Sequence, residues 1–167
     1  MKAPLTKILL GLCLAFSVPS IAQNALELDN HKILFAAVKA IHLDDILDKS
    51  GPYTVFAPSD AAFERFSNAK IEQLINSNDK SALKSLLTYH IVAGHLTASR
   101  ILRAMCRGNG KASFTTIQGK KLVAHMEGYD IVLTDPMGNT ARITTADINI
   151  KNGVIHEIDS VILPTQM

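Results

Sequence analysis

Tryptophan is absent from this sequence and cysteine is scarce, with only Cys13 and Cys106 in a chain of 167 residues. So few cysteines exclude a miniprotein held together by disulfides and every zinc site with four cysteine ligands. An excess of one charge is also lacking, because 17 Lys and Arg side chains stand against 15 Asp and Glu side chains, a formal net charge of +2. Binding to nucleic acid through phosphate contacts is therefore not expected. What the chain does have is 47% hydrophobic residues, enough for the core of one globular domain.

The first residues have the pattern of a secretory signal peptide. Lys2 and Lys7 precede an apolar run over residues 8–18, and small residues follow at the positions where such peptides are cleaved. The run is too short for a membrane-spanning helix, which needs about 20 apolar residues. We therefore expect residues 1–22 to be removed and residues 23–167 to form one domain, without a membrane span, in the periplasm or outside the cell.

Removal of the signal peptide would also remove Cys13. Cys106 would then be the single cysteine, with no partner for a disulfide inside the chain. Its thiol can be a small buried side chain or a group for intermolecular bonding. Of the two we expect burial, since free cysteine is among the most buried residue types.

Apolar residues recur at helical spacing in the first part of the chain and alternate with polar residues from residue 113 onward. The predicted helices span residues 30–41, 43–49, a segment after Ser59, 70–77, 79–92 and 97–104. The predicted strands span residues 53–57, 114–117, 121–124, 130–134, 142–145, 148–151, 154–158 and 161–163. Helices followed by strands indicate a single domain of the α+β class.

Several residues are placed to begin helices or to fill the core. Asn30, Ser59 and Thr97 each stand just before a helical pattern, where their side-chain oxygens can accept free backbone N–H groups. His90 falls within the apolar stripe of the predicted helix 79–92. A histidine in that position is expected to be buried and hydrogen-bonded.

In the strand-rich part, the sequence predicts one tight turn and one strand pairing between distant segments. Asn152 and Gly153 both tolerate the positive φ that a two-residue type I′ hairpin requires. We expect the early strand 53–57 to pair with the last strand, 161–163, and so to close the domain end to end. The entropy cost of such a closure grows only slowly with loop length.

Three segments, in order, resemble the motifs of the fasciclin-type domain, the family that includes fasciclin and beta-Ig-h3. They are YTVFAPSDAAF at residues 53–63, LLTYHIV at residues 86–92 and NGVIHEIDSVILP at residues 152–164. The resemblance implies a β-wedge of short strands flanked by an N-terminal group of helices, with the first and last motifs on neighbouring central strands. It also implies an adhesion module of the kind found in secreted and surface proteins.

Catalytic and metal-binding patterns are not found. The six histidines show no pair at one-face helical spacing with a third ligand nearby, so no metal site is predicted. There is no Gly-x-Ser-x-Gly elbow, and Cys106 has no histidine that the sequence places beside it. We therefore predict no catalytic residue, no cofactor and no enzymatic activity.

Candidate partner-binding residues come from the resemblance and from helix geometry. The resemblance implies Tyr89, His90, Asp147 and Ile148 as contacts, with the Tyr89 ring nearer the surface. The alternatives are a core histidine at position 90 and an aspartate in a turn at position 147.

A third candidate is a basic helix face. Arg100, Arg103 and Arg107 gather positive charge on one side of the predicted helix, suited to an acidic glycan or a carboxylate. The alternative is an ordinary solvated face.

Taken together, these candidates predict an adhesion or recognition module for a protein or carbohydrate surface, monomeric or weakly self-associating. A periplasmic carrier or sensor for a small molecule is the other hypothesis, and a deep apolar pocket would favour it.

Overall fold

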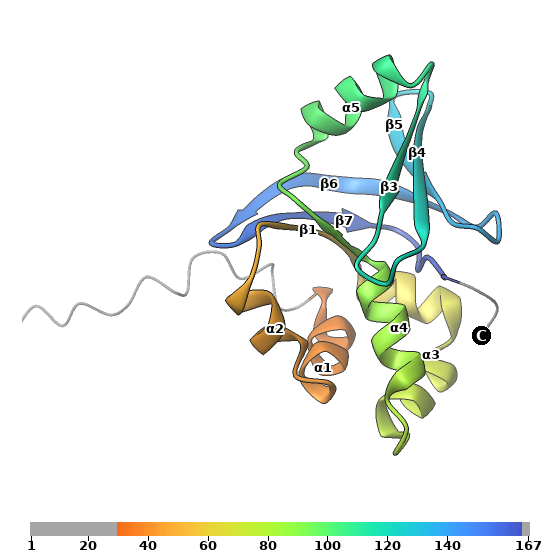
Figure 1. Ribbon diagram of the computed structural model, residues 1–167. Coiled ribbons are helices and arrows are strands. Elements are labelled where there is room, and N and C mark those ends of the chain that lie inside the picture. Colours follow the sequence, from red (N-terminus) through yellow and green to blue (C-terminus); the bar gives the residue numbers. More distant parts are fainter. Residues whose placement is uncertain (1–29, 165–167) are drawn as a thin grey trace, which may run out of the picture.

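The structure is a computed structural model that describes residues 30–164 (Figure 1). Its helices are α1 (Lys32–Ala40), α2 (Leu43–Lys49), α3 (Asp60–Asn76), α4 (Ser81–Tyr89) and α5 (Ala98–Arg107). Its strands are β1 (Tyr53–Pro58), β2 (Ile91–Ala93), β3 (Lys111–Thr115), β4 (Lys121–Glu127), β5 (Asp130–Thr134), β6 (Thr140–Ile150) and β7 (Gly153–Ile158). The predicted α+β class is confirmed, whereas the predicted signal peptide at residues 1–22 and Cys13 lie outside the described residues.

Within the described residues, the strands form one sheet in the order β2-β1-β7-β6-β5-β4-β3. β1 and β7 are parallel, and the other neighbours are antiparallel. Figure 1 shows α1 to α4 together on one side of β1 and β7, with α5 on the other side, above β6 and beside the upper ends of β3 to β5. The helices thus cover different parts of the sheet.

β6 joins the two parts of the sheet because it pairs with β5 near its start and with β7 near its end. Its pairing with β7 shifts register between Ile143 and Thr145 and again between Thr145 and Ile148. Within the second shift Asp147 adopts a positive φ of 62°. Such irregularities bend a strand and increase its twist, so the predicted strands 142–145 and 148–151 are one bent strand.

The buried apolar side chains form two clusters. One lies among α1 to α4 and the adjoining face of β1 and β7, and includes Phe63, Leu83, Leu86 and Ile155. The other lies beneath α5 and includes Phe56, Ile101, Met105, Leu122 and Leu133. Because β1 contributes Ala57 to the first cluster and Phe56 to the second, the central strands separate the two.

The first and last sequence motifs lie on neighbouring central strands, as the resemblance implied. β1 runs parallel to β7 with Phe56 opposite His156, and their rings stack with centroids 5.6 Å apart. The partner predicted for residues 53–57, the segment 161–163, is wrong, because the structure assigns no strand to it. The hairpin strand that precedes this segment takes its place.

The turn before β7 also differs from the prediction. Ile150 pairs with Gly153, so Lys151 and Asn152 form the turn and Gly153 already belongs to the strand. A Cβ atom at Gly153 would lie 1.8 Å from the backbone oxygen of Tyr53. Glycine is therefore required here by the close approach of β1 rather than by a type I′ turn.

α4 ends earlier than predicted. The helix stops at Tyr89 with His90 as its C-cap, and the residues that follow form β2 rather than a last helical turn. Ile91 and Val92 pair with Val55 and Thr54 of β1. Both Ile91 and Val92 are β-branched and favour a strand, so pairing with β1 overrides the helical spacing of the sequence.

The first helix begins at Lys32 rather than after an Asn30 cap, and its N-cap residue His31 makes no side-chain cap bond. Its free N–H groups at Lys32 and Ile33 donate instead to the two carboxylate oxygens of Asp60, at 3.1 and 2.9 Å. The caps predicted at Ser59 and Thr97 are confirmed.

α2 and the second part of α3 correspond to two of the predicted helices. The predicted helix 43–49 is confirmed as α2, and the predicted helix 70–77 is the second part of α3, which is interrupted at Ser67.

Candidate functional site

The structure divides the predicted binding residues into a buried group and an exposed group. Tyr89 and His90 are 0% and 2% exposed. Arg100, Arg103 and Asp147 are exposed, and their neighbour Ile148 is half-buried. The prediction that the Tyr89 ring lies nearer the surface is wrong, because this side chain is fully buried. Only the exposed group can present charge to a partner.

Tyr89 belongs to the core beneath α5. Its hydroxyl donates to the backbone oxygen of Lys121 at 2.8 Å. Burial, and secondarily the negative charge of Asp135, raises the pKa of Tyr89. The hydroxyl therefore stays neutral and acts as a structural donor.

His90 is the buried, hydrogen-bonded histidine that its position predicted. Its Nδ1–H donates to the oxygen of Leu86 at 2.9 Å, and its Nε2 accepts from the N–H of Ile162 at 3.3 Å. Its backbone oxygen accepts from the N–H of Phe56 at 2.8 Å. Burial lowers the pKa of His90 to about 4, against opposing effects of the Leu86 hydrogen bond and Asp135. The neutral imidazole thus joins α4 to the C-terminal segment, and the backbone oxygen of the same residue joins α4 to β1.

His156 is a second buried histidine, to which sequence reasoning assigned no role. Its Nε2–H donates to the oxygen of Leu96 at 2.7 Å, and its Nδ1 accepts from the N–H of Asp147 at 3.2 Å. Burial lowers the pKa of His156, which keeps the ring neutral. The sequence signal for this role was a histidine that follows the apolar residues Val154 and Ile155 in the predicted strand 154–158. We call His90, His156 and Phe56 between them the motif junction.

Asp147 connects the motif junction to α5. Its N–H is held by His156, while its carboxylate Oδ1 accepts from the N–H of Ala98, the first residue of α5, at 2.8 Å. An aspartate at this end of a helix satisfies a free donor and interacts favourably with the helix dipole. The Asp147 carboxylate therefore lies at the N-terminus of the helix that carries the arginines.

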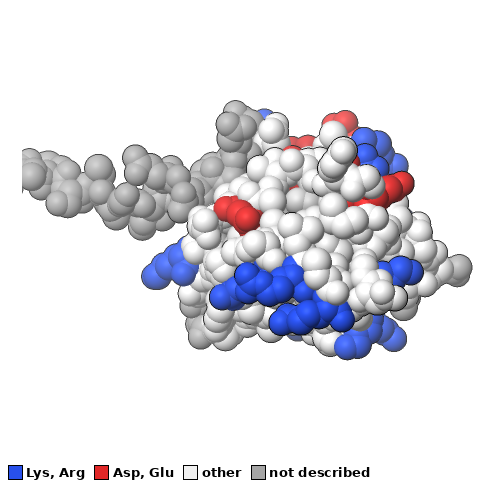
Figure 2. Space-filling view, turned by 90° about the horizontal axis from the view of Figure 1, so that it is seen from above, with Lys and Arg blue, Asp and Glu red and all other residues white. Residues whose placement is uncertain are grey.

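α5 presents one polar face to solvent because Ile101 and Met105 turn the opposite face into the core. We define the α5 surface as its exposed side chains Ser99, Arg100, Leu102, Arg103, Cys106 and Arg107. Figure 2 shows Lys and Arg side chains in a band on the upward face of Figure 1, where α5 lies.

The arginines of the α5 surface differ in their partners. The guanidinium of Arg100 donates to the backbone oxygen of His95 at 2.8 Å. None of the ion pairs between residues 30 and 164 involves Arg103 or Arg107. Their charges are thus open to an acidic partner.

Cys106 is exposed, so the prediction of burial is wrong. The buried stripe of α5 runs through Ile101 and Met105, and Cys106 stands one position beyond it. One residue along a helix is a rotation of about 100°, which is enough to carry the thiol from the core to the surface.

We also searched the described residues for metal sites, cavities and membrane-spanning helices. Residues 30–164 contain no group of three or more His, Cys, Asp or Glu side chains that could hold a metal ion. The same residues line open cavities of about 160 to 410 Å³. None of the described helices has the length and apolar character needed to cross a bilayer.

The fold and the motif junction define a fasciclin domain. The family model of that name matches residues 29–164. The chain belongs to the fasciclin domain family.

Similar proteins come from bacteria and animals. Protein sll1483 of Synechocystis sp. is 33% identical over 148 residues, which make up 89% of this chain and 75% of that protein. The cell surface glycolipoprotein MPB83 of Mycobacterium bovis is 33% identical over 124 residues, 74% of this chain and 49% of that protein. A solved FAS1 domain pair from the insect cell adhesion molecule fasciclin I matches with a TM-score of 0.58 and 25% identity, over 78% of this chain and 44% of that one.

Proposed function

We propose that this protein is an exported, non-enzymatic adhesion or recognition module. Its α5 surface binds acidic groups on a protein or carbohydrate surface. The observation that carries the proposal is the pair Arg103 and Arg107, exposed one turn apart and without an ion pair among the described residues. Similarity to a cell adhesion molecule and to a cell surface glycolipoprotein supports the same function.

The geometry of α5 suits recognition of carboxylate, sulfate or phosphate groups. Arginine presents a planar fork of donors that matches such anions in two-point contacts. The helix is fixed at its start by the Thr97 cap and by Asp147, and Ile101 and Met105 anchor it to the core. The arginines therefore extend from a rigid support, which reduces the entropy lost on binding.

The carrier hypothesis receives less support. A small-molecule site is usually a deep, mostly apolar cavity with a few convergent polar groups. The cavities that described residues line are open, and the polar groups His90 and His156 already have partners on both ring nitrogens. In the described part neither His90 nor His156 belongs to a group of three or more His, Cys, Asp or Glu side chains that could hold a metal ion, which supports a non-enzymatic function.

The test compares wild-type protein with Arg103→Ala/Arg107→Ala on an array of neutral and acidic glycans and in pull-downs from cell-envelope extract. We expect the acidic ligands retained by wild type to bind the variant about tenfold more weakly. The matched control is Lys39→Ala/Lys84→Ala, which removes two exposed charges from α1 and α4. That variant should bind like wild type.

Asp147→Asn sharpens the test, because asparagine keeps an oxygen acceptor for the Ala98 N–H but removes a negative charge from the N-terminal end of α5. Acidic ligands should bind this variant as well as wild type or more tightly. If wild type retains no acidic ligand, or if the arginine variant binds as well as wild type, the proposed function is wrong.

A further inference from the structure

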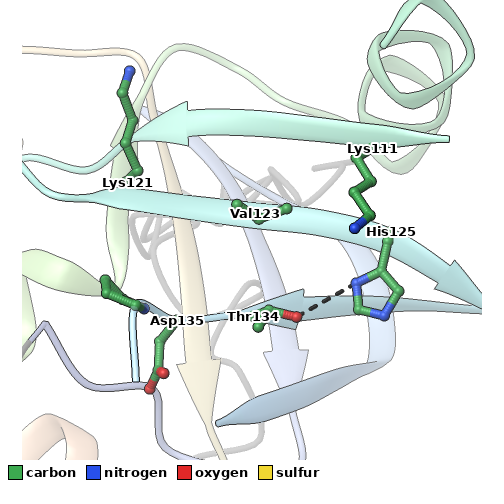
Figure 3. A pocket seen from close by; sticks show the side chains of 7 residues that line it. Lys111, Lys121, Val123, His125, Thr134 and Asp135 are labelled. Atoms are coloured by element: carbon green, nitrogen blue, oxygen red, sulfur yellow. Dashed lines mark hydrogen bonds between the residues drawn. The ribbon is translucent and has the colours of Figure 1, made fainter. Parts of the chain in front are cut away.

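A second basic site lies on the other face of the sheet from α5. It is a groove with a cavity volume of about 360 Å³, and Figure 3 shows the side chains that line it. Its lining residues are Lys111, Lys121, Val123, His125, Thr134, Asp135 and Pro136.

The groove follows from the alternation of side chains along the strands. Ala112, Leu122 and Ala124 point inward, where they pack in the cluster that contains Met105 of α5. Their neighbours Lys111, Lys121, Val123 and His125 therefore point to the opposite face. No described helix covers this face in Figure 1, so it is open to a ligand.

The two lysines stand at opposite ends of the groove. Lys111 pairs with His125 across β3 and β4, and Lys121 lies four residues from His125 along β4. At about 3.4 Å per residue this is roughly 14 Å between the lysine positions. The Lys121 ammonium donates to Thr115 Oγ1 at 2.6 Å, which holds it at its own end, while Lys111 points toward His125 (Figure 3).

The acidic side chains nearby do not neutralise the lysines. No ion pair among the described residues involves Lys111 or Lys121. The Asp135 carboxylate lies at the Lys121 end of Figure 3 and points away from the Lys121 ammonium; it accepts from N–H groups of Met137, Asn139 and Leu163, each at 2.9 Å.

Two further acidic residues near the end of β4 are also engaged. Glu127 and Asp130 are paired with Arg142, at 3.5 and 3.2 Å. The groove consequently offers two separated positive charges.

Between the lysines the groove has an apolar floor and polar walls. Val123 is half-buried at its centre, and the Thr134 hydroxyl and His125 Nδ1 lie 3.4 Å apart beside it. The hydroxyl and the imidazole can exchange hydrogen bonds with sugar hydroxyls, while the valine suits the C–H face of a sugar ring.

We propose that this groove binds an extended acidic polysaccharide, with Lys111 and Lys121 contacting two carboxylate groups along one chain. A single compact anion does not fit, because the two lysines are far apart and Lys121 is held away from the centre. An extended peptide fits less well, because the backbone groups of β4 are already paired with β3 and β5 and leave no partners for a peptide backbone. This site is separate from the α5 surface and goes beyond the proposed function.

The experiment measures binding of oligogalacturonate by calorimetry in a protein that already carries Arg103→Ala/Arg107→Ala, so that α5 does not contribute. We expect this background to bind the oligosaccharide, and added Lys111→Gln/Lys121→Gln to weaken binding by about tenfold, the effect of losing two exposed charge contacts. Lys111→Arg/Lys121→Arg is the matched control and should retain binding within about twofold. Dextran, poly-glutamate and inorganic phosphate are the comparison ligands.

Each result decides for or against the groove. Binding of oligogalacturonate that exceeds binding of all three comparison ligands, and that depends on the two lysines, supports it. Poly-glutamate binding equal to that of oligogalacturonate would show a peptide site instead, and equal binding of phosphate would show a simple anion site. Binding that survives the glutamine substitutions overturns the proposal, as does the absence of binding, whatever happens at the α5 surface.

Discussion

The motif junction and the α5 surface are both rich in nitrogen-bearing side chains, yet they use them in opposite ways. At the motif junction, His90 and His156 are buried, neutral and bonded through both ring nitrogens to groups of the same chain. On the α5 surface, Arg103 and Arg107 are exposed and make no ion pair with a described residue. The residues that make the sequence recognisable therefore build the scaffold, whereas the exposed arginines lie outside the three sequence motifs.

The contrast arises because all three motif segments meet at one place. Phe56 comes from the first motif, His90 from the central one, and His156 and Ile162 from the last, and direct contacts join them. A substitution there disturbs several segments together, while a substitution on α5 changes one side chain. The two regions should consequently respond very differently to mutation.

Gly153→Ala should produce the largest loss of stability. The added Cβ would lie 1.8 Å from the Tyr53 oxygen and force β1 and β7 apart. We expect the free energy of unfolding to fall by about 4 kcal/mol or more, measured by urea denaturation. Gly128→Ala is the control, since that glycine has a φ of +62° and open space around it. The control should lose only about 1 kcal/mol, and equal losses in the two variants would contradict the steric explanation.

His156→Ala should come next, with a loss of about 3 kcal/mol. The substitution leaves the Leu96 oxygen and the Asp147 N–H without partners and opens a cavity beside Phe56. Arg103→Ala, on the α5 surface, should change stability by less than about 0.5 kcal/mol. Thermal melts of the two variants would test the comparison directly, and similar shifts in melting temperature would show that it is wrong.

Acid should weaken the motif junction by a smaller amount. His90 has a pKa of about 4 in the folded protein and an ordinary value of 6.5 when unfolded. As pH falls below 6.5 the unfolded chain takes up a proton that the folded chain does not, so the stability present at neutral pH is lost progressively down to about pH 4.

The stability that is lost through protonation of His90 can be measured by comparison with His90→Gln, whose side chain does not titrate. Between pH 7.5 and pH 5.5, wild type should lose about 1 kcal/mol more than this variant. Urea denaturation at the two pH values measures the difference. Parallel losses in the two proteins would mean that His90 is not protected from protonation.

Much of the fold could be predicted because its signals are local. The Ser59 and Thr97 caps and the helix at residues 43–49 depend on neighbours within a few positions, and all were confirmed. The errors came from contacts distant in sequence. Ile91 and Val92 left the helical pattern to pair with β1, and Gly153 was needed for a strand about a hundred residues away.

The candidate site was less predictable than the fold. Arg100 and Arg103 were found from helical spacing alone, but their partners could not be, since these depend on which side chains α5 meets in space. Asp147 was found only through the resemblance, and its contact with Ala98 needs the bend in β6. The groove between Lys111 and Lys121 gave no signal, because its residues alternate with core residues on three short strands.

The parallel pairing of β1 with β7 also bears on how a nascent chain acquires this structure. β1 is made early, but its central neighbour is completed only when Ile158 has been synthesised. Until then the emerging polypeptide can form its local helices and the β1–β2 pair, but not the middle of its sheet. Because folding slows as contacts become more distant in sequence, the domain should reach its native state only after the residues up to Ile158 have left the ribosome.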